Sequence, residues 1–137
     1  MITPTPKTNA MLVCDYVITE QETNKKSLIG IFENIGAVKF PFMHPSLSVY
    51  IKLTEARGTY RFRLDLVNLQ TNTLVGQGEI PNDITIASPL TSHELVFNLR
   101  GLKFMEPGEY EFRIFANDGI FGQKTFNVSQ LAAKDAG

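Results

Sequence analysis

Cysteine is almost absent from this sequence of 137 residues, in which Cys14 is the only thiol. A single cysteine excludes an intramolecular disulfide, and a chain without disulfides fits a reducing compartment best. The neighbours of Cys14 are hydrophobic, and apolar surroundings raise the pKa of a thiol and make it unreactive. We therefore expect a cytoplasmic protein in which Cys14 is a buried, reduced core residue.

Motifs that carry chemistry are also missing. The two histidines, His44 and His93, show none of the spacings of zinc ligands, and there is no phosphate-binding glycine loop, nucleophile elbow or calcium-binding loop. Tryptophan is absent and only four tyrosines occur, which gives little support to a platform for stacking sugars. We expect no enzyme activity, no catalytic residue, no cofactor and no metal. A small-ligand or carbohydrate-binding domain is the weakest alternative.

Long apolar segments and an excess of positive charge are missing as well. No stretch reaches the roughly 20 apolar residues that span a bilayer, and the first apolar run, residues 10–14, is too short for the core of a signal peptide. Lysine and arginine number 13 against 14 aspartates and glutamates, whereas nucleic-acid binding relies on clustered positive charge. The expected partner is therefore another protein or a second copy, and not nucleic acid or a membrane.

Strand patterns, in contrast, are abundant, and the clearest lies in residues 107–128. Apolar and charged residues alternate over residues 109–114, which is typical of a strand with one buried face. Asp118-Gly119 predicts a tight turn, because these residue types tolerate positive φ. The segment is expected to form an antiparallel hairpin with Phe112 and Phe126 on the same buried face.

The register of this hairpin contains a conflict. A plain two-residue turn at Asp118-Gly119 would place Phe112 opposite Thr125, and a face that is both core and solvent is not stable. We therefore predict that Phe112 lies opposite Phe126. The extra residue is absorbed by a three-residue loop or by a bulge, most naturally at Gly122.

About eight strands can be traced, with turns every ~8–12 residues and no amphipathic helix. The pattern predicts an all-β fold, an antiparallel β-sandwich of immunoglobulin-like type, with a barrel as the alternative. The expected organisation is a flexible leader over residues 1–9, one sandwich domain over residues 10–129 and a tail over residues 130–137. One of the expected strands comprises residues 27–35, and residues 36–45 are expected to form a loop because they contain two prolines. The predicted core consists of Tyr16, Phe32, Ile51, Phe62, Leu64, Phe97, Phe112 and Phe126.

Bulky apolar residues without strand periodicity occur in residues 39–45. The candidate docking residues there are Phe40, Phe42, Met43 and His44. Two interpretations remain open. The side chains plug one end of the sandwich, since large exposed apolar patches are rare, or some of them stay exposed as an interface.

Asp15 is unusual because it lies between Cys14 and Tyr16 in an apolar strand, where a buried carboxylate needs partners. We expect it to accept hydrogen bonds from backbone amides or an arginine. The alternative is a metal-dependent or hydrolytic enzyme with a site near Asp15, His44 and His93. That alternative requires the three side chains to converge in one pocket.

Several short motifs occur in a characteristic order. They are Cys14-Asp15-Tyr16, Leu28-Ile29-Gly30-Ile31-Phe32, Phe40-Pro41 with His44-Pro45, and the hairpin with Gly108, Tyr110, Phe112 and its Asp118-Gly119 turn. In this order they resemble a family of small bacterial proteins of unknown function. The resemblance implies a single-domain β-sandwich and brings no substrate, cofactor or catalytic residue. The expected function is a non-enzymatic protein-interaction or assembly module.

Overall fold

The computed structural model describes residues 3–132, and every regular element in this range is a β-strand. The strands are β1 (Lys7–Thr19), β2 (Lys26–Ile31), β3 (Asn34–Ala37), β4 (Phe42–Thr54), β5 (Gly58–Tyr60), β6 (Phe62–Asn68), β7 (Thr73–Glu79), β8 (Ile84–Ile86), β9 (His93–Phe104), β10 (Gly108–Ala116) and β11 (Gly119–Gln130). β1 begins at Lys7, so the strand includes residues 7–9 of the expected leader. Most of the expected tail, residues 133–137, lies outside the described residues.

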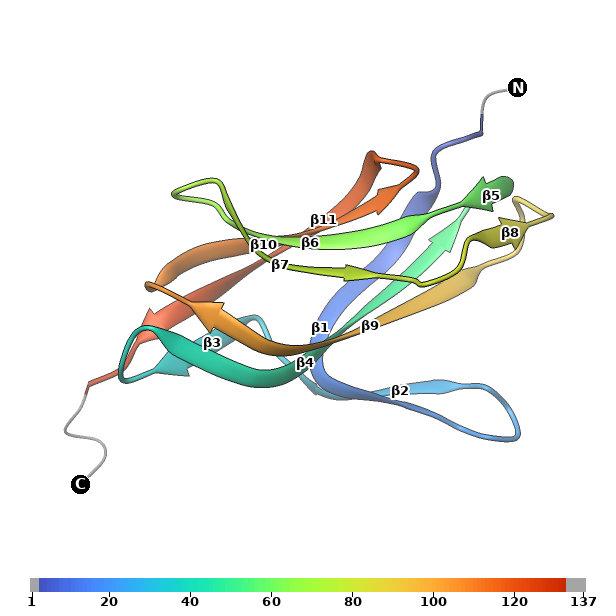
Figure 1. Ribbon diagram of the computed structural model, residues 1–137. Helices are drawn as coiled ribbons and strands as arrows, with labels where there is room; N and C mark the ends of the chain where they lie inside the picture. Colours follow the sequence, from blue (N-terminus) through green and yellow to red (C-terminus); the bar gives the residue numbers. More distant parts are fainter. Residues whose placement is uncertain (1–2, 133–137) are drawn as a thin grey trace.

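Two sheets pack face to face, as Figure 1 shows. The first has the strand order β2-β1-β4-β9 and the second the order β3-β11-β10-β6-β7, while β5 and β8 form a small separate ladder. The predicted β-sandwich is therefore confirmed. The described residues form eleven strands rather than about eight. The expected strand over residues 27–35 is divided into β2 and β3, and β5 and β8 are too short to give a periodic pattern.

The core lies between the inner faces of the two sheets. Six of the eight predicted core residues belong to it; Phe32 is only partly buried at its border, and Tyr16 is 52% exposed. The rings of Phe112 and Phe126 stack with their centroids 5.4 Å apart, and Phe104 meets Tyr110 edge to face at 4.9 Å. Such aromatic pairs add about 0.5–1.5 kcal/mol beyond the area that they bury. The prediction for Tyr16 was wrong because β1 has left β4 at this point.

The C-terminal hairpin differs in register from the prediction. The turn is Asn117-Asp118, with φ of 50° and 69°, and not Asp118-Gly119. Phe112 lies opposite Lys124 rather than Phe126. The ladder shifts by one residue between Ile114 and Phe115, next to Gly122, where a bulge was expected. The predicted pairing is wrong by two positions. Side chains alternate with period two, so Phe112 and Phe126 still share the buried face.

The expected loop over residues 36–45 is also partly wrong, because β3 extends to Ala37 and β4 already begins at Phe42. Proline is tolerated in a strand whose free side needs no donor. Over residues 42–47, β4 pairs with β9 only, since its pairing with β1 starts at Ser48. Pro45 lies in this one-sided part of the strand, near Gly101, whose φ is 62°.

Candidate functional site

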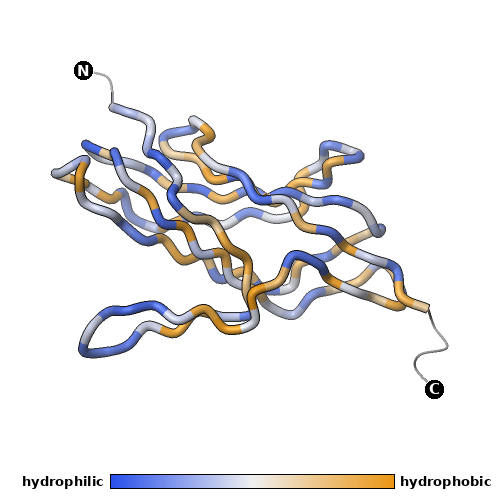
Figure 2. The backbone as a smooth tube through the Cα atoms, turned by 180° about the vertical axis from the view of Figure 1, so that it is seen from behind, coloured by the Kyte–Doolittle hydropathy of each residue, from blue (hydrophilic) through white to orange (hydrophobic). Residues whose placement is uncertain are grey.

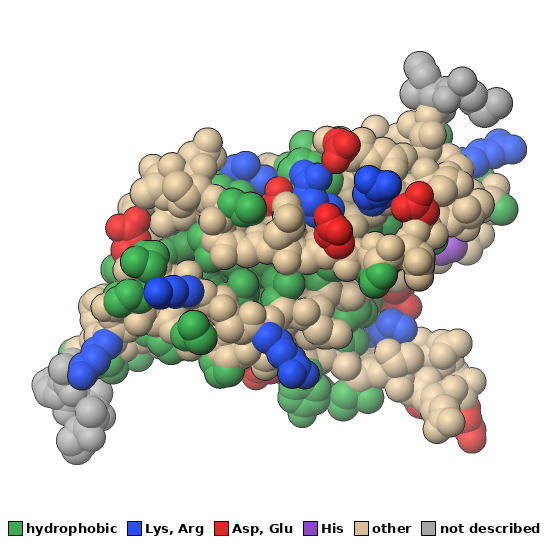
Figure 3. All heavy atoms as spheres, viewed as in Figure 1, with side chains coloured by type: hydrophobic (Ala, Val, Ile, Leu, Met, Phe, Trp, Pro, Cys, Tyr) green, Lys and Arg blue, Asp and Glu red, His purple; other side chains and the backbone are tan. Residues whose placement is uncertain are grey.

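A two-stranded arm leaves the first sheet at Cys14. β1 pairs with β4 from Lys7 to Cys14 and with β2 from Cys14 to Thr19, so residues 15–31 have no neighbour in the sheet beyond each other. Figures 1 and 3 show this arm projecting from the body of the sandwich. In Figure 2 its tip is hydrophilic, while both of its strands are hydrophobic nearer the sandwich.

The register of the arm gathers four large apolar side chains on one face. Tyr16 lies opposite Ile29, Ile31 follows two residues after Ile29, and Ile18 follows two residues after Tyr16. Their exposed fractions are 52% for Tyr16, 47% for Ile18, 38% for Ile29 and 55% for Ile31. We call these four residues the arm face. Isolated exposed apolar side chains are ordinary on protein surfaces, but a contiguous group of them marks an interaction site.

The opposite face of the arm is turned toward the sandwich. Val17 and Leu28, which pair across the arm, are half-buried. Near the tip, Lys26 Nζ lies 3.9 Å from Glu94 Oε1 of β9. Glu94 also accepts a hydrogen bond from the Tyr50 hydroxyl; burial, together with Glu94, raises the pKa of Tyr50 to about 12. The arm is thus positioned at its tip as well as at its base, which keeps the arm face outward.

Asp15 and Gly30 define the base of the arm. Gly30 has φ of 70°, which favours glycine, and a Cβ on it would lie 2.2 Å from Asp15 Oδ2 unless that side chain moved. Asp15 is exposed and makes no hydrogen bond or ion pair with the described residues, so the prediction that backbone amides or an arginine bind its carboxylate was wrong. A carboxylate in solvent needs no protein partner.

Asp15 and His44 line one hollow of about 340 Å³, together with Phe32 of the arm base. The His44 ring lies between Phe32 and Phe42, with centroid distances of 6.1 and 6.0 Å. Its Nδ1 is buried and makes no hydrogen bond to the described residues. Burial lowers the pKa of His44, while the negative charge of Asp15 acts in the opposite direction. The structure therefore brings Asp15 and His44 together in one hollow.

His93 lies far from this hollow. It pairs with Leu53, whereas His44 pairs with Leu102, so nine residues of β4 separate the two positions. At about 3.3 Å per residue the separation is about 30 Å. The hypothesis of a site formed by Asp15, His44 and His93 is therefore wrong. Within residues 3–132 no group of three histidine, cysteine, aspartate or glutamate side chains could hold a metal ion.

In the candidate docking segment, some side chains plug the sandwich and one remains exposed for an interface. Phe40 and Phe42 are partly buried and pack against the core, as a plug would. Met43 is 60% exposed, and His44 is half-buried in the hollow described above. Met43 is thus the one large apolar side chain of this segment that is available to a partner.

Cys14 is fully buried, as predicted. Burial, assisted by the negative charge of Asp15, raises the pKa of the thiol. A thiol with a raised pKa is a poor nucleophile because little thiolate is present. Cys14 is therefore a packing residue at the point where the arm begins.

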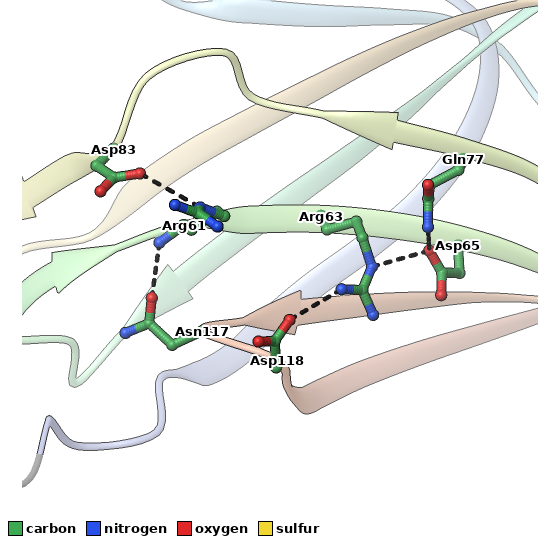
Figure 4. A network of polar contacts seen from close by, with 7 residues as sticks. All are labelled: Arg61, Arg63, Asp65, Gln77, Asp83, Asn117 and Asp118. Atoms are coloured by element: carbon green, nitrogen blue, oxygen red, sulfur yellow. Dashed lines mark hydrogen bonds and ion pairs between the residues drawn. The ribbon is translucent and has the colours of Figure 1, made fainter.

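A polar network covers the outer face of the second sheet, as Figure 4 shows. Arg63 binds Asp65 at 3.1 Å and Asp118 at 3.0 Å, and its guanidinium lies 4.3 Å from the centre of the Phe115 ring. Gln77 donates to Asp65 at 2.8 Å, and the backbone N–H of Arg61 donates to Asn117 at 2.9 Å. These groups satisfy one another, and the mixed charges make this face an ordinary solvated surface.

Comparison with known proteins identifies the family. A family of unknown function, DUF6941, matches residues 9–129. The chain belongs to this family. The resemblance inferred from the sequence motifs is confirmed to the extent that the chain is a member of a family without an assigned activity. No curated protein matches the chain.

Solved structures share its architecture at low identity. The alkylpurine DNA glycosylase AlkC of Pseudomonas fluorescens has a TM-score of 0.52 and 9% identity, covering 90% of this chain and 30% of that one. A β-glucosidase of Listeria innocua has a TM-score of 0.51 and 10% identity, covering 95% of this chain and 16% of that one. An immunoglobulin-like protein of Pseudomonas aeruginosa has a TM-score of 0.43 and 12% identity, covering 92% of this chain and 98% of that one.

The first two similarities concern the fold alone, which is an all-β sandwich. The chain spans less than a third of the glycosylase and about a sixth of the glucosidase, so the activities of those larger proteins are not carried over. None of the described residues forms a helix that is long and apolar enough to cross a membrane.

Proposed function

We propose that this protein is a non-enzymatic assembly module that pairs with a second copy of itself through the arm. The observation that carries the proposal is the arm face, where four large apolar side chains lie together in solvent. Met43, the outward residue of the docking segment predicted from the sequence, is a second, smaller candidate contact. The lack of a catalytic constellation among the described residues is consistent with this role.

The free edge of β2 favours a second copy as the occupant. β2 is the outermost strand of its sheet, so one row of its backbone N–H and C=O groups is unpaired. Antiparallel pairing of two β2 strands about a two-fold axis satisfies both rows at once. When the axis is perpendicular to the sheet and passes between the two copies of one residue, Ile29 and Ile31 of both copies lie on the same face of the joined sheet. The two arm faces then form a continuous apolar surface of eight side chains.

The energy balance predicts a weak, concentration-dependent dimer. Burying a large apolar side chain completely contributes about 1.5–3 kcal/mol. Because the four side chains are about half exposed, covering all eight would contribute at most on the order of 6–12 kcal/mol, and edge pairing covers mainly those beside the seam. Association costs about 4–15 kcal/mol in lost rigid-body freedom. The two amounts are comparable, so we expect dissociation within an accessible concentration range.

Sedimentation velocity over a hundred-fold range of protein concentration tests the proposal. The wild-type protein should shift from monomer to dimer, and Ile29→Lys should remain monomeric. Ile120→Lys, at a similarly exposed position on β11, is the matched control and should behave as the wild type. Thermal melts check that each variant is folded. A wild-type protein that stays monomeric, or dimers that persist in folded Ile29→Lys, would contradict the proposal.

Two further variants separate the roles within the docking segment. Phe42→Ser should lower the melting temperature, because this ring packs against the core. Met43→Ser should leave the melting temperature unchanged, because the side chain is exposed. If Met43→Ser also weakens the dimer, the interface extends from the arm onto β4. If dimerisation is unchanged, the interface is confined to the arm.

A further inference from the structure

A groove runs along the other open side of the sandwich, away from the arm, and goes beyond the proposed self-association. β7 is the last strand of its sheet and β9 is the last strand of the other sheet. The two strands lie side by side in Figure 1. Residues 75–81 and 96–102 line a groove of about 590 Å³ between them, which we call the edge groove.

The floor of the edge groove is apolar, and two glycines of β7 border it. A Cβ on Gly76 would lie 2.7 Å from Leu102, and one on Gly78 would lie 3.0 Å from Leu99. The two glycines therefore let β7 approach the side chains of β9 closely. Figure 3 shows hydrophobic atoms recessed along the molecule between two polar rims. An extended chain could place small apolar side chains on this floor.

The rims of the groove present backbone groups. Each of the two edge strands has one row of N–H and C=O groups without a strand partner. Only another extended polypeptide offers donors and acceptors at the repeat of a strand, so peptide addition is the binding mode that matches this chemistry. Seven lining residues on each side correspond to about 23 Å, the length of a strand of about seven residues.

β9 offers the longer edge for pairing. It pairs with β4 from His93 to Phe104 without a register shift, and its one residue with positive φ, Gly101, lies near one end of the groove. The ladder between β6 and β7 shifts next to Val75 at the same end, and β7 stops at Glu79, before the groove ends at Pro81. A strand that extends past both ends of the groove favours addition beside β9 over addition beside β7.

Charge gives the bound peptide a direction. Arg100 of β9 and Glu79 of β7 both line the groove, and neither has an ion-pair partner within the part of the chain that the structure describes. Gly78 faces Phe97 and Leu99, while Gly76 faces Leu102, so the two strands run in opposite directions. Arg100 therefore lies toward the Gly76 end and Glu79 toward the Phe97 end. A complementary peptide has an acidic residue at the first end and a basic residue at the second.

We propose that the edge groove binds an extended segment of a partner protein, which adds as a strand to β9. The segment has about seven residues, with small apolar side chains toward the floor, an acidic residue at Arg100 and a basic residue at Glu79. A second copy of this chain is the occupant of the arm and not of the groove.

The test uses a library of random heptapeptides displayed on phage and selected on the immobilised full-length protein. The peptide that binds most tightly is synthesised, its affinity is measured by calorimetry, and amide hydrogen exchange locates its site. We expect slower exchange in β9, alternation of apolar residues in the selected sequences, and at least a ten-fold weaker affinity for Arg100→Glu. Lys52→Glu, an exposed change on β4, is the matched control and should bind as the wild type.

Ile29→Lys separates this inference from the proposed function, because it removes self-association but should leave peptide affinity unchanged. Selection of no peptide, or of peptides that leave exchange in β9 unaltered, overturns the inference. Peptides that protect β2 instead overturn it too, and identify the arm as the peptide site. Protection of β9 that grows with protein concentration without peptide would mean that the groove holds a second copy, which also overturns it.

Discussion

The arm and the C-terminal hairpin each place apolar side chains on one face, but that face is buried in only one of them. The C-terminal hairpin, β10 and β11, alternates apolar and polar residues, and its apolar face is buried completely at Phe112 and almost completely at Phe126. The arm also gathers apolar side chains on one face, yet its Tyr16 and Ile31 are about half exposed. The difference lies in the neighbours. β10 lies between β6 and β11, whereas the distal half of β1 has only β2.

The comparison shows that alternation determines which side chains share a face, but not whether that face is covered. Coverage depends on strands distant in the sequence. The first sheet reaches Cys14 through the pairing of β1 with β4 and stops there. A face that remains uncovered despite its apolar residues is available for contacts with another molecule, and the following predictions test whether the two hairpins differ as this argument requires.

Truncation of the buried hairpin should have the largest effect. Phe112→Ala should lower the free energy of unfolding by about 3–5 kcal/mol, because the transfer energy of the ring is lost and a cavity remains. Tyr16→Ala should lower it by only about 0.2–1 kcal/mol, the contribution of a cross-strand pair. Urea unfolding of both variants at a concentration where the protein is monomeric measures the difference. Equal losses would show that the arm is as well packed as the core.

Much of this contrast could be predicted from the sequence, but not all of it. The β-sandwich, the shared face of Phe112 and Phe126 and the bulge near Gly122 follow from periodicity and glycine placement. The exact register does not, because Asn117-Asp118 and Asp118-Gly119 are both good turn sequences and the choice depends on the bulge.

The candidate site could be predicted only in part. Both faces of β1 are apolar, so the sequence does not show which of them is covered. The prediction placed Tyr16 in the core, while the structure leaves its face open. Likewise Phe40 and Phe42 pack inward and Met43 outward. The alternation in this segment follows the pairing of β4 with β9, which no local pattern reveals.

The glycines of the two hairpins should respond differently to substitution. In Gly122→Ala the new Cβ would lie 2.5 Å from Thr8 Oγ1 and 3.0 Å from Ile114 Cγ2, in a packed region. Overpacking of this kind costs about 1–3 kcal/mol. In Gly30→Ala the backbone conformation costs about 1–2 kcal/mol, while the exposed Asp15 side chain can rotate away from the new methyl group. The loss in the free energy of unfolding, measured with urea, should be at least as large for Gly122→Ala as for Gly30→Ala.

A double variant sharpens this test. Asp15→Ala removes the carboxylate that a methyl group on Gly30 would meet, so it should relieve only the steric part of the Gly30→Ala loss. If Asp15→Ala restores the whole loss, the backbone of Gly30 is not strained. If it restores none of it, the carboxylate already moves without cost.

Protonation of His44 should destabilise the arm and leave the C-terminal hairpin unaffected, because a histidine lies beside the base of the arm and, among the described residues, none lies beside that hairpin. Burial lowers the pKa of His44 below its ordinary value of 6.5. The unfolded chain therefore binds the proton more readily, so the free energy of unfolding should fall as the pH decreases below about 6.5. Thermal melts between pH 7 and pH 5 measure this slope, above the range in which carboxylates titrate.

The slope should become smaller in His44→Gln, and His93→Gln is the matched control for the loss of an imidazole elsewhere. Amide exchange at the lower pH should increase in the arm before it increases in β10. An unchanged slope in His44→Gln would show that another group is responsible for the pH dependence.

The smallest expected effect is measured in the wild-type protein. It is the rate at which Cys14 becomes accessible to a thiol reagent when the arm opens. The thiol is fully buried and its pKa is raised, so labelling by a thiol reagent under native conditions should be slow. Cys14 lies where β1 passes from β4 to β2, and elements with few neighbours open at lower free energy than the core. At low urea its labelling should therefore be nearly independent of urea, because only the arm opens, and at higher urea it should follow global unfolding. Amide exchange in β10 should follow global unfolding throughout. Labelling as fast as in the unfolded chain would mean that Cys14 is not protected. Labelling that follows global unfolding at every urea concentration would mean that the two hairpins open together, in which case the arm is part of the cooperative core despite its exposed face.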